Sequence, residues 1–463
     1  MNPRRLFTAS CIALITSAFS FMIRQDISDP LGTEFAFTKQ TVGDIMGAAF
    51  WGMALTMLVF APLCDLLGMG KVLLLAWLAH LIGILGTIFA GDLSHIAFVD
   101  SMVLSLGGQG KASYYVLWLS TFLVGSGNGL VEIAINPLAA TLYPREKTHY
   151  LNILHAWWPG GLMMAGLLAT VLVNPLMGLK EVPLLGFKRA IADPGAAQAL
   201  AWKVKMALLL VPLFIYGLMF LGQKFPQTER VQHNVSTGEM FLQAFRPMFL
   251  LWAFCMVLTA STELGPNQWQ ESVLPRTANV SGTLMFVYTS MLMFGMRFFA
   301  GPLAHKLSPV GMLTCSAILS GVGLYWLSYA NNPALALAAS TVFGVGVAYF
   351  WPTMLGVTAE RFPKGGALLL GLMGAIGNLS ISQTLPQMGA IYDSYTVQAI
   401  PTDRLDSKIK AEDGKEIDLV VNEDTKSWVP NAIAQYIYPS GSRKLNPEAV
   451  NVLEKRVKEG DAG

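Results

Sequence analysis

The sequence predicts an all-α polytopic membrane protein, and two observations carry this prediction. Hydrophobic residues make up 53% of the 463 residues and charged residues only 13%, whereas soluble globular domains carry about 25% charged residues. Apolar runs long enough to cross a bilayer recur along residues 1–393. The expected fold is therefore a bundle of membrane-spanning helices followed by a polar C-terminal appendage.

Eleven spans are expected, one for each apolar run of transmembrane length. No small-residue cleavage site follows the first run, so we interpret it as an uncleaved span. The spans cover residues 6–24, 43–64, 71–91, 114–143, 149–175, 203–222, 247–271, 283–304, 308–329, 333–361 and 365–392.

Loop charges predict the orientation of the spans. If the spans alternate, most basic residues fall on one side of the membrane, and the first loop on the other side carries Asp26, Asp29 and Glu34. The positive-inside rule then places the N-terminus in the cytoplasm. The basic loop 176–202 argues against this orientation, although long loops count less in the rule. We expect a multi-pass protein of the cell membrane, inner or plasma.

The chain divides into two related halves. A shift of 219 residues places Gly125, Gly127 and Pro144 onto Gly344, Gly346 and Pro363, and parallel repeats with a central site between them are one way in which transporters are built. The expected units are an N-terminal transmembrane half (1–222), a cytoplasmic linker (223–246), a C-terminal transmembrane half (247–393) and a polar tail (394–463).

The tail carries signals of a small folded appendage. Residues 408–421 alternate around Asp413-Gly414, which is typical of a hairpin, and Asn446-Pro447 is typical of a helix start. After eleven spans the tail would lie on the non-cytoplasmic face. Because a twelve-span architecture needs one more apolar run, we expect a chain truncated after an insertion between spans eleven and twelve; a protein that functions with eleven spans is the alternative.

One carboxylate, Glu132, lies in the middle of the fourth apolar run. An ionised side chain at bilayer depth costs about 2.5–3.5 kcal/mol on insertion scales, so such residues usually mark an ion or substrate path. We therefore predict a functional Glu132; the alternative is a protonated side chain that is hydrogen-bonded to a neighbouring helix. The preceding GSGNG sequence follows no predicted strand, and we interpret it as close helix packing rather than a nucleotide loop.

Amide, carboxylate and aromatic side chains lie at membrane depth and are candidates for a substrate site, and they include the groups that a sugar would need. Sugar hydroxyls need polar partners, and the C–H faces of the ring need aromatic planes. Any one of these residues could instead be an interfacial anchor or a helix–helix contact, so we expect about half to touch substrate. The candidates are Asn136, Asn152, His155, Trp158, Glu263, Asn267, Gln268, Trp269, Trp351 and Asn378.

Four residues are candidates for gating. Asp65, Gly68 and Lys71 form a short turn between the second and third spans, where Asp65 could cap the next helix and the charges could lock one conformation. A simple topology signal is the alternative reading of this turn. Arg297 is expected to be a gate residue at the cytoplasmic end of a span. His80, alone in the third span, is expected to be a packed histidine.

The segment EIAINPLAATLYPREKTHYLNILHAWWPGG resembles the fucose/glucose-galactose permease branch of the major facilitator superfamily, a branch of L-fucose/proton symporter-like proteins. The loop 61–71 resembles the superfamily signature, and MRFFAGPLAHKLSP resembles its second copy. The similarity covers roughly residues 10–393. Ala61 and Leu66 replace the first glycine and the arginine of the signature, and His305 stands where an acidic residue is usual.

The resemblance implies a secondary active transporter that takes up a monosaccharide by proton symport through alternating access, as a monomer without a cofactor. It assigns proton coupling to Glu132, which matches the span-four glutamate of the family. It also points to Asp26 as the nearest counterpart of the span-one aspartate, with Asp29 as second choice. Arg24 could pair with Asp26 and hold it ionised, so that Glu132 carries the coupling alone.

Other functions remain open at this point: sodium-linked sugar uptake, nucleoside uptake, export of an amphipathic compound, or a transporter-derived membrane sensor. The basic residues lie in short loops rather than on one face, so nucleic-acid binding is not expected. The four cysteines are scattered singly and show no metal spacing. No nucleophile–base pair or phosphate loop predicts an enzyme. The expected partners are a small solute, protons and the lipid bilayer.

Overall fold

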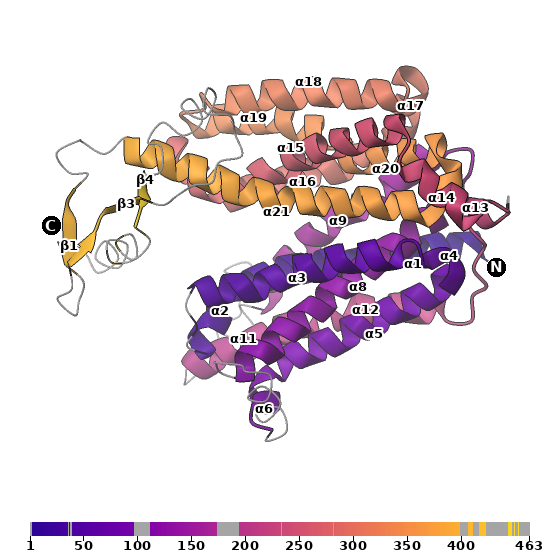
Figure 1. Cartoon of the computed structure of the whole chain (residues 1–463). Helices are drawn as coiled ribbons and strands as arrows, with labels where there is room; N and C mark the ends of the chain where they lie inside the picture. The colour runs from indigo at the N-terminus through magenta and orange to yellow at the C-terminus, as the bar shows by residue number, and fades with distance from the viewer. Residues whose placement is uncertain are drawn as a thin grey trace. The chain divides into compact units, whose positions relative to one another are not determined.

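The computed structural model describes residues 2–35, 37, 39–96, 112–173, 194–232, 234–280, 282–398, 406–410, 416–422, 443–446, 449 and 452. Helices occupy every stretch in which the sequence predicts a span (Figure 1). In the described part of the chain, nine helical runs are long and apolar enough to cross a membrane. Of the other two predicted spans, one coincides with the shorter apolar helix Asp44–Phe60 and the other with the 16-residue helix Gly282–Arg297.

The helices of the two predicted halves and of the predicted linker follow one another along the chain. The N-terminal half contains α1 (Pro3–Asp26), α2 (Ser28–Glu34), α3 (Lys39–Phe60), α4 (Cys64–Leu67), α5 (Met69–Ile88), α6 (Ala90–Ser94), α8 (Ala112–Leu142), α9 (Lys147–Leu167), the π-helix η1 (Leu168–Val173), α11 (Pro194–Ala207) and α12 (Leu210–Phe220). The linker contains α13 (Glu229–Gln232) and α14 (Thr237–Ala244). The C-terminal half contains α15 (Pro247–Thr277), α16 (Gly282–Arg297), α17 (Ala300–Leu307), α18 (Pro309–Leu327), α19 (Pro333–Val347), α20 (Phe350–Arg361), the 3-10 helix η3 (Pro363–Gly365) and α21 (Gly366–Gln398).

Proline and a polar cap begin several of these helices. Asn2 accepts a hydrogen bond from the backbone N–H of Arg5 at 3.1 Å, and Pro3 opens α1. Asn332 likewise accepts from the N–H of Leu335 at 3.0 Å, and α19 opens at Pro333. Proline fits the first turn because its missing N–H would have no partner there. These local signals fix where the spans start.

Small residues bring the helices of the N-terminal half into close contact. A Cβ atom on Gly125 of α8 would collide with the backbone carbonyl of Ala49 in α3, and one on Gly127 would collide with the ring of His80 in α5. The GSGNG sequence therefore packs helices together, as predicted, and lies inside a helix.

The repeat partners of these glycines also lie at contacts between helices, in the C-terminal half. A Cβ atom on Gly346 of α19 would collide with the backbone of Ser320 in α18, and one on Gly344 would lie 3.4 Å from Thr289 Cγ2 in α16. In each half the first glycine thus faces the second helix, and the second glycine faces the third. This correspondence agrees with the 219-residue shift.

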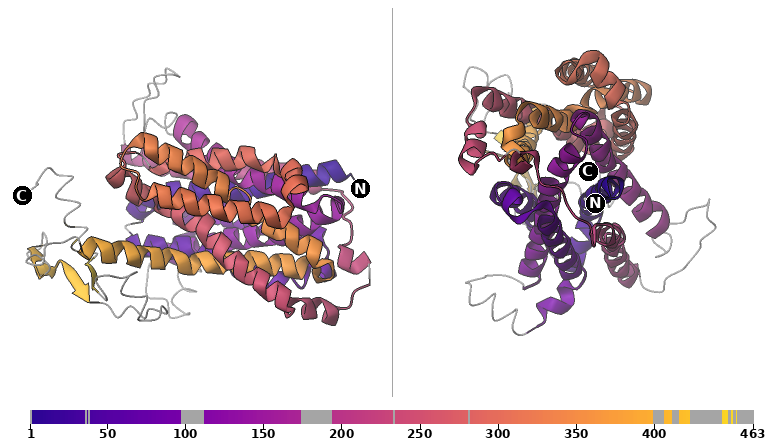
Figure 2. Two further views of the ribbon diagram at one scale, coloured as in Figure 1. Left: turned by 90° about the horizontal axis from the view of Figure 1, so that it is seen from above. Right: turned by 90° about the vertical axis from the view of Figure 1, so that its right-hand side faces the viewer.

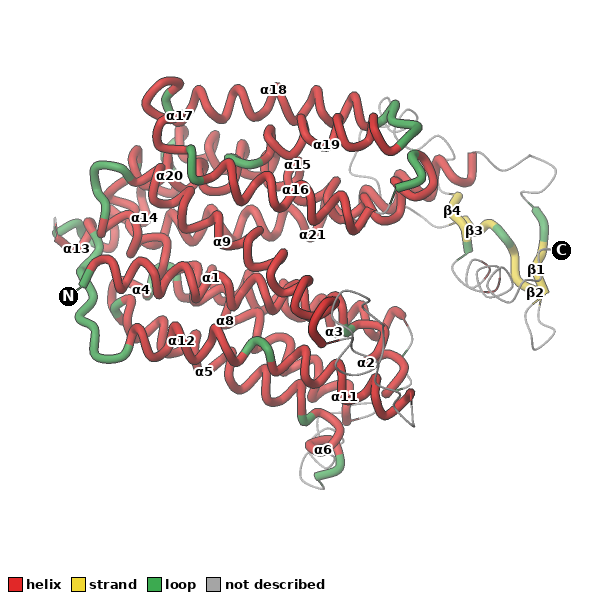
Figure 3. The backbone as a smooth tube through the Cα atoms, turned by 180° about the vertical axis from the view of Figure 1, so that it is seen from behind, coloured by secondary structure: helices red, strands yellow, loops and turns green. Residues whose placement is uncertain are grey.

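The two halves form separate bundles that meet along α9. Figures 1, 2 and 3 show α1, α3, α5, α8 and α12 in one bundle and α15, α16, α18 and α19 in the other. α9 packs against α1 within its own half and against α16, α17 and α20 of the other half. Any coupling between the halves can therefore act through α9.

The chain divides into two compact units, Met1–Ile381 and Ser382–Gly463, with the division inside α21. In the second unit, β1 (Lys408–Lys410) pairs antiparallel with β2 (Glu416–Asp418), and β3 (Val420–Asn422) pairs with β4 (Arg443–Leu445). The predicted hairpin is therefore present. Of the helix expected after Asn446, only Ala449 and Val452 are described, and both are helical.

Replacing Gly125 by alanine should destabilise the protein. The added Cβ would press on the Ala49 backbone, and overpacking of this kind costs about 1–3 kcal/mol. We expect a lower thermal unfolding midpoint for the purified protein in detergent. Gly47→Ala in α3 is the control, because a Cβ there meets nothing within 4 Å. Equal midpoints for the two variants would contradict the packing role of Gly125.

Candidate functional site

Glu132 lies in the middle of α8 and is 5% exposed. One turn later, Asn136 Nδ2 donates a 2.7 Å hydrogen bond to Glu132 Oε2. Asn136 Oδ1 faces His155 Nε2 of α9 at 2.9 Å, and because this oxygen can only accept, the His155 Nε2 carries the hydrogen. The structure thus joins three residues that the sequence predicts for the site.

The carboxylate of Glu132 has no permanent cation beside it. Among the described residues, its only partner within ion-pair range is His155 Nε2, at 3.8 Å. The hydrogen bond from Asn136 is neutral. No described lysine or arginine therefore stabilises the ionised form of Glu132, and a buried acid of this kind is typical of an ion or substrate path.

A second buried carboxylate, Glu263 of α15, has a different environment. Arg297 Nη2 of α16 donates to Glu263 Oε1 at 2.9 Å, and the two side chains are 2% and 4% exposed. The backbone N–H of Trp351 donates to Glu263 Oε2 at 3.3 Å. Glu263 is thus held as one half of an ion pair, in a position where a free carboxylate would be costly.

Arg297 also joins the two halves. Its Nη1 donates to the carbonyl of His155 in α9 at 2.6 Å, and its Nε donates to the carbonyl of Ala348 at 2.7 Å. The sequence predicts a gate residue at a span end; Arg297 is the last residue of α16, but it is buried at 1% exposure and lies inside the predicted span 283–304. Its buried ion pair with a predicted sugar-binding residue was not anticipated.

The first turns of α9 carry further hydrogen bonds to the C-terminal half. Asn152, another predicted substrate residue, donates through Nδ2 to Thr353 Oγ1 at 3.2 Å, while its Oδ1 is buried without a partner. Together with the Arg297 contact, these bonds hold the halves together at the end of the bundle where α9 begins. Two more hydrogen bonds from α9 to the C-terminal half run from Lys147 Nζ to the Ala359 carbonyl at 3.2 Å and from Thr148 Oγ1 to Glu360 Oε1 at 2.6 Å.

The remaining predicted substrate residues are dispersed. Asn267 and Asn378 each donate to a carbonyl of their own helix, those of Glu263 at 2.7 Å and Gly374 at 2.9 Å. Trp158 is half-buried and packs edge-on against Phe21 of α1, with ring centroids 5.1 Å apart. Trp351 is half-buried and lies against Gly377.

Two of the predicted substrate residues carry no side-chain description. Gln268 and Trp269 belong to α15, but their side chains lie outside the described part of the chain.

The predicted ion pair between Arg24 and Asp26 is wrong. Asp26 pairs with Lys205 of α11, whereas Arg24 Nε donates to the Ser20 carbonyl at 2.8 Å and its guanidinium lies 5.4 Å from the Phe21 ring. The reason is helical geometry, because residues two apart on a helix do not face each other. Asp29, the second choice, has a side chain outside the described residues.

The predicted cap by Asp65 is also wrong. α5 begins after Gly68, which has a φ of +83° and provides no side-chain cap. Asp65 belongs to its own short helix, α4, and its Oδ1 accepts from Thr228 Oγ1 of the linker at 2.6 Å. Lys71 is exposed. The turn between the second and third spans therefore fastens the linker to the N-terminal half.

Sequence reasoning missed a buried polar network in the N-terminal half. His80 Nδ1 lies 3.2 Å from Tyr216 Oη, and its Nε2 lies 2.9 Å from Asn128 Oδ1. Asn128 Nδ2 in turn donates to Ser20 Oγ at 3.0 Å. His80 is packed, as expected. The sequence signal for this network is Asn128 within GSGNG, a segment whose glycines alone carry the packing prediction.

The family model of the Major Facilitator Superfamily matches residues 6–382. No curated protein matches the chain. The chain is similar to FucP in the outward conformation, with TM-score 0.68, 14% identity and coverage of 86% of this chain and 93% of that chain. It is similar to the proton:xylose symporter XylE bound to 6-bromo-6-deoxy-D-glucose, with TM-score 0.67, 12% identity and coverage of 85% and 89%. It is also similar to the human organic anion transporter MFSD10, with TM-score 0.59, 13% identity and coverage of 85% and 94%. At these identities the likeness concerns the fold.

Breaking the Glu263–Arg297 pair should destabilise the protein more than removing both charges. Arg297→Met leaves a buried carboxylate without its cation, a change that costs about 3–5 kcal/mol. The double variant Arg297→Met/Glu263→Gln should recover part of the lost thermal stability in detergent. Arg361→Met, at an exposed arginine of the same half, is the control. A double variant whose loss equals the sum of the single losses would show that the pair is not coupled.

Proposed function

The chain belongs to the major facilitator superfamily of membrane transporters, and from that premise we propose that it takes up a monosaccharide together with a proton. The carrying observation is Glu132: a buried carboxylate that faces the neutral Asn136 side chain and lies 3.8 Å from His155. Ionisation at this depth costs free energy. A proton on Glu132 removes that cost, so the protonated form favours the occluded state in which the solute crosses.

A short chain of hydrogen bonds joins Glu132 to the C-terminal half. Asn136 links the carboxylate to His155, and the carbonyl of His155 accepts from Arg297 of the C-terminal half. When Glu132 loses its proton, the hydrogen bond from Asn136 strengthens, because a carboxylate is a stronger acceptor than a carboxyl group. This change can reach α9 through His155, and alternating access requires the contacts of α9 with the other half to break and re-form.

The polar groups beside this path support a sugar as the solute. Asn152 Oδ1 is buried and without a partner, so a sugar hydroxyl can donate to it. Trp158 and Phe21 offer aromatic surface for the C–H face of a ring. The similarity to FucP and to the proton:xylose symporter supports the same choice of solute and coupling ion.

A second candidate is an anionic solute, and Arg24 is the observation that favours it. Its side chain is buried, its Nη1 has no hydrogen-bond partner, and no described carboxylate forms an ion pair with it. A buried cation without a counter-charge is costly. A sugar acid would supply that counter-charge, while a neutral sugar would not.

Replacing Glu132 by glutamine should uncouple solute from proton. In cells expressing the wild type, we expect sugar accumulation with alkalinisation of the medium, and an uptake rate that falls as external pH rises because fewer carriers are protonated. Glu132→Gln should lose accumulation by more than about tenfold, because each 1.4 kcal/mol of lost driving free energy is a factor of 10. The variant should keep sugar exchange.

Glu146→Gln, at an exposed carboxylate before α9, is the matched control and should behave as wild type. Accumulation by Glu132→Gln at the wild-type level would rule out Glu132 as the coupling group. Absence of sugar uptake by folded wild-type protein in the membrane would rule out a sugar as the solute.

Competition by sugar acids separates the two candidates. If the solute is neutral, excess hexuronate should leave hexose uptake unchanged. In that case Arg24→Gln should not alter the preference between hexose and hexuronate. If the solute is anionic, hexuronate should be the better competitor by about tenfold or more, and Arg24→Gln should abolish that preference. The readout is inhibition of radiolabelled uptake by each compound.

A further inference from the structure

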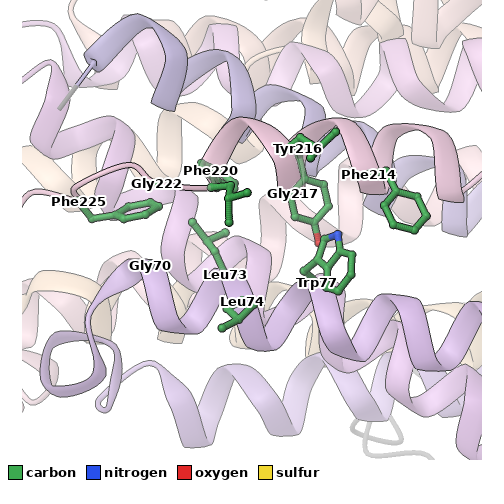
Figure 4. Close-up of a pocket in the computed structure, with 12 residues that line it drawn as sticks. Gly70, Leu73, Leu74, Trp77, Phe214, Tyr216, Gly217, Phe220, Gly222 and Phe225 are labelled. Atoms are coloured by element: carbon green, nitrogen blue, oxygen red, sulfur yellow. The ribbon is translucent and has the colours of Figure 1, made fainter.

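A groove lies on the N-terminal half between α5 and α12, outside the site of Glu132. It encloses about 440 Å³ and is lined almost entirely by apolar side chains. Figure 4 shows Leu73, Leu74 and Trp77 of α5 across from Tyr216 and Phe220 of α12. In a membrane protein, such a groove opens to lipid rather than to water.

The groove has defined ends. Trp77 Nε1 donates to the Leu213 carbonyl at 3.2 Å and joins α5 to α12 at one end. At the other end, the ring of Phe225 in the linker lies against Gly70, where an added Cβ would be 2.7 Å from Phe225 Cδ2. The outer wall is open, because Leu74 is 58% and Leu218 is 64% exposed. An elongated apolar group can therefore enter from the side.

A second hollow, with a larger share of polar lining than the groove, adjoins the groove at Phe225. It encloses about 350 Å³, shares Gly70 and Phe225 with the groove, and is lined by Asp65, Lys71 and Thr228 among others. The Asp65 carboxylate accepts from Thr228. The two hollows thus form one amphipathic site, apolar along α5 and α12 and polar at the linker.

Basic side chains surround the polar end. Arg5 donates to the carbonyls of Leu218 at 3.0 Å and Met219 at 2.8 Å, at the C-terminal end of α12. Lys71 directly follows Gly70 and Lys224 directly precedes Phe225; both are exposed, and neither forms an ion pair with any described residue. Among the described residues, these three cations outnumber the Asp65 carboxylate that lines the hollow, so this rim is positive.

We propose that this site binds an anionic glycerophospholipid, with one acyl chain in the groove and the phosphate at Arg5, Lys71 and Lys224. Burial of acyl CH₂ groups in the groove favours binding through the hydrophobic effect. The basic residues at its end attract an anionic headgroup. The lipid contacts α5, α12 and the linker at once, so its occupancy fastens the linker to the N-terminal half. The site does not depend on which solute is carried.

The test is lipid retention by the purified full-length protein, measured by native mass spectrometry with phosphatidylglycerol or phosphatidylcholine added. For wild type we expect one phosphatidylglycerol retained, with at least about a tenfold preference over phosphatidylcholine, and a higher thermal unfolding midpoint in its presence. Lys71→Gln/Lys224→Gln should lose the preference. Leu74→Trp, which fills the open wall of the groove, should lose both lipids.

Matched controls are Lys306→Gln, an exposed lysine of α17, and Leu258→Trp, a 52% exposed leucine of α15. Both should retain phosphatidylglycerol as wild type does. Equal retention of the two lipids by wild type would overturn the assignment of an anionic headgroup. Phosphatidylglycerol retention that is unchanged in Leu74→Trp would overturn the groove as the binding site.

Discussion

The cost of burying charge at membrane depth determines how this protein is built. For Glu263, an ion pair with Arg297 at 2.9 Å offsets the cost of burial. Among the described residues, Glu132 has a neutral amide at hydrogen-bond distance and a histidine at 3.8 Å, and no lysine or arginine within ion-pair range. The two buried carboxylates therefore have different surroundings, and this difference supports Glu132 as the proposed coupling group.

α9 connects these two carboxylates. Its His155 side chain donates to Asn136, which in turn donates to Glu132, while the backbone carbonyl of His155 accepts from Arg297. A single residue therefore links Glu132, the proposed coupling group, to the ion pair of the other half. The hydrogen bonds from Thr148 and Asn152 of α9 to α20 lie within two turns of His155. The geometry makes α9 the element on which both halves act.

The spans and the nearest-neighbour contacts could be predicted from the sequence, because they depend on apolar length and on helical periodicity. Glu132 and Asn136 are four residues apart, so their contact follows from the helix alone. The Glu263–Arg297 pair depends on how two helices pack, and no local pattern reveals it. The error over Arg24 and Asp26 came from treating closeness in sequence as closeness in space, although Asp26 pairs with Lys205.

Proton uptake on solute binding tests most directly whether Glu132 is the proposed coupling group. The purified protein in lightly buffered detergent with a pH-indicator dye should take up about one proton per sugar bound, because binding and protonation are linked reciprocally. Glu132→Gln should bind the sugar, detected by tryptophan fluorescence, without taking up a proton. Sugar binding to wild type with no proton uptake, or equal uptake by the variant, would contradict the claim.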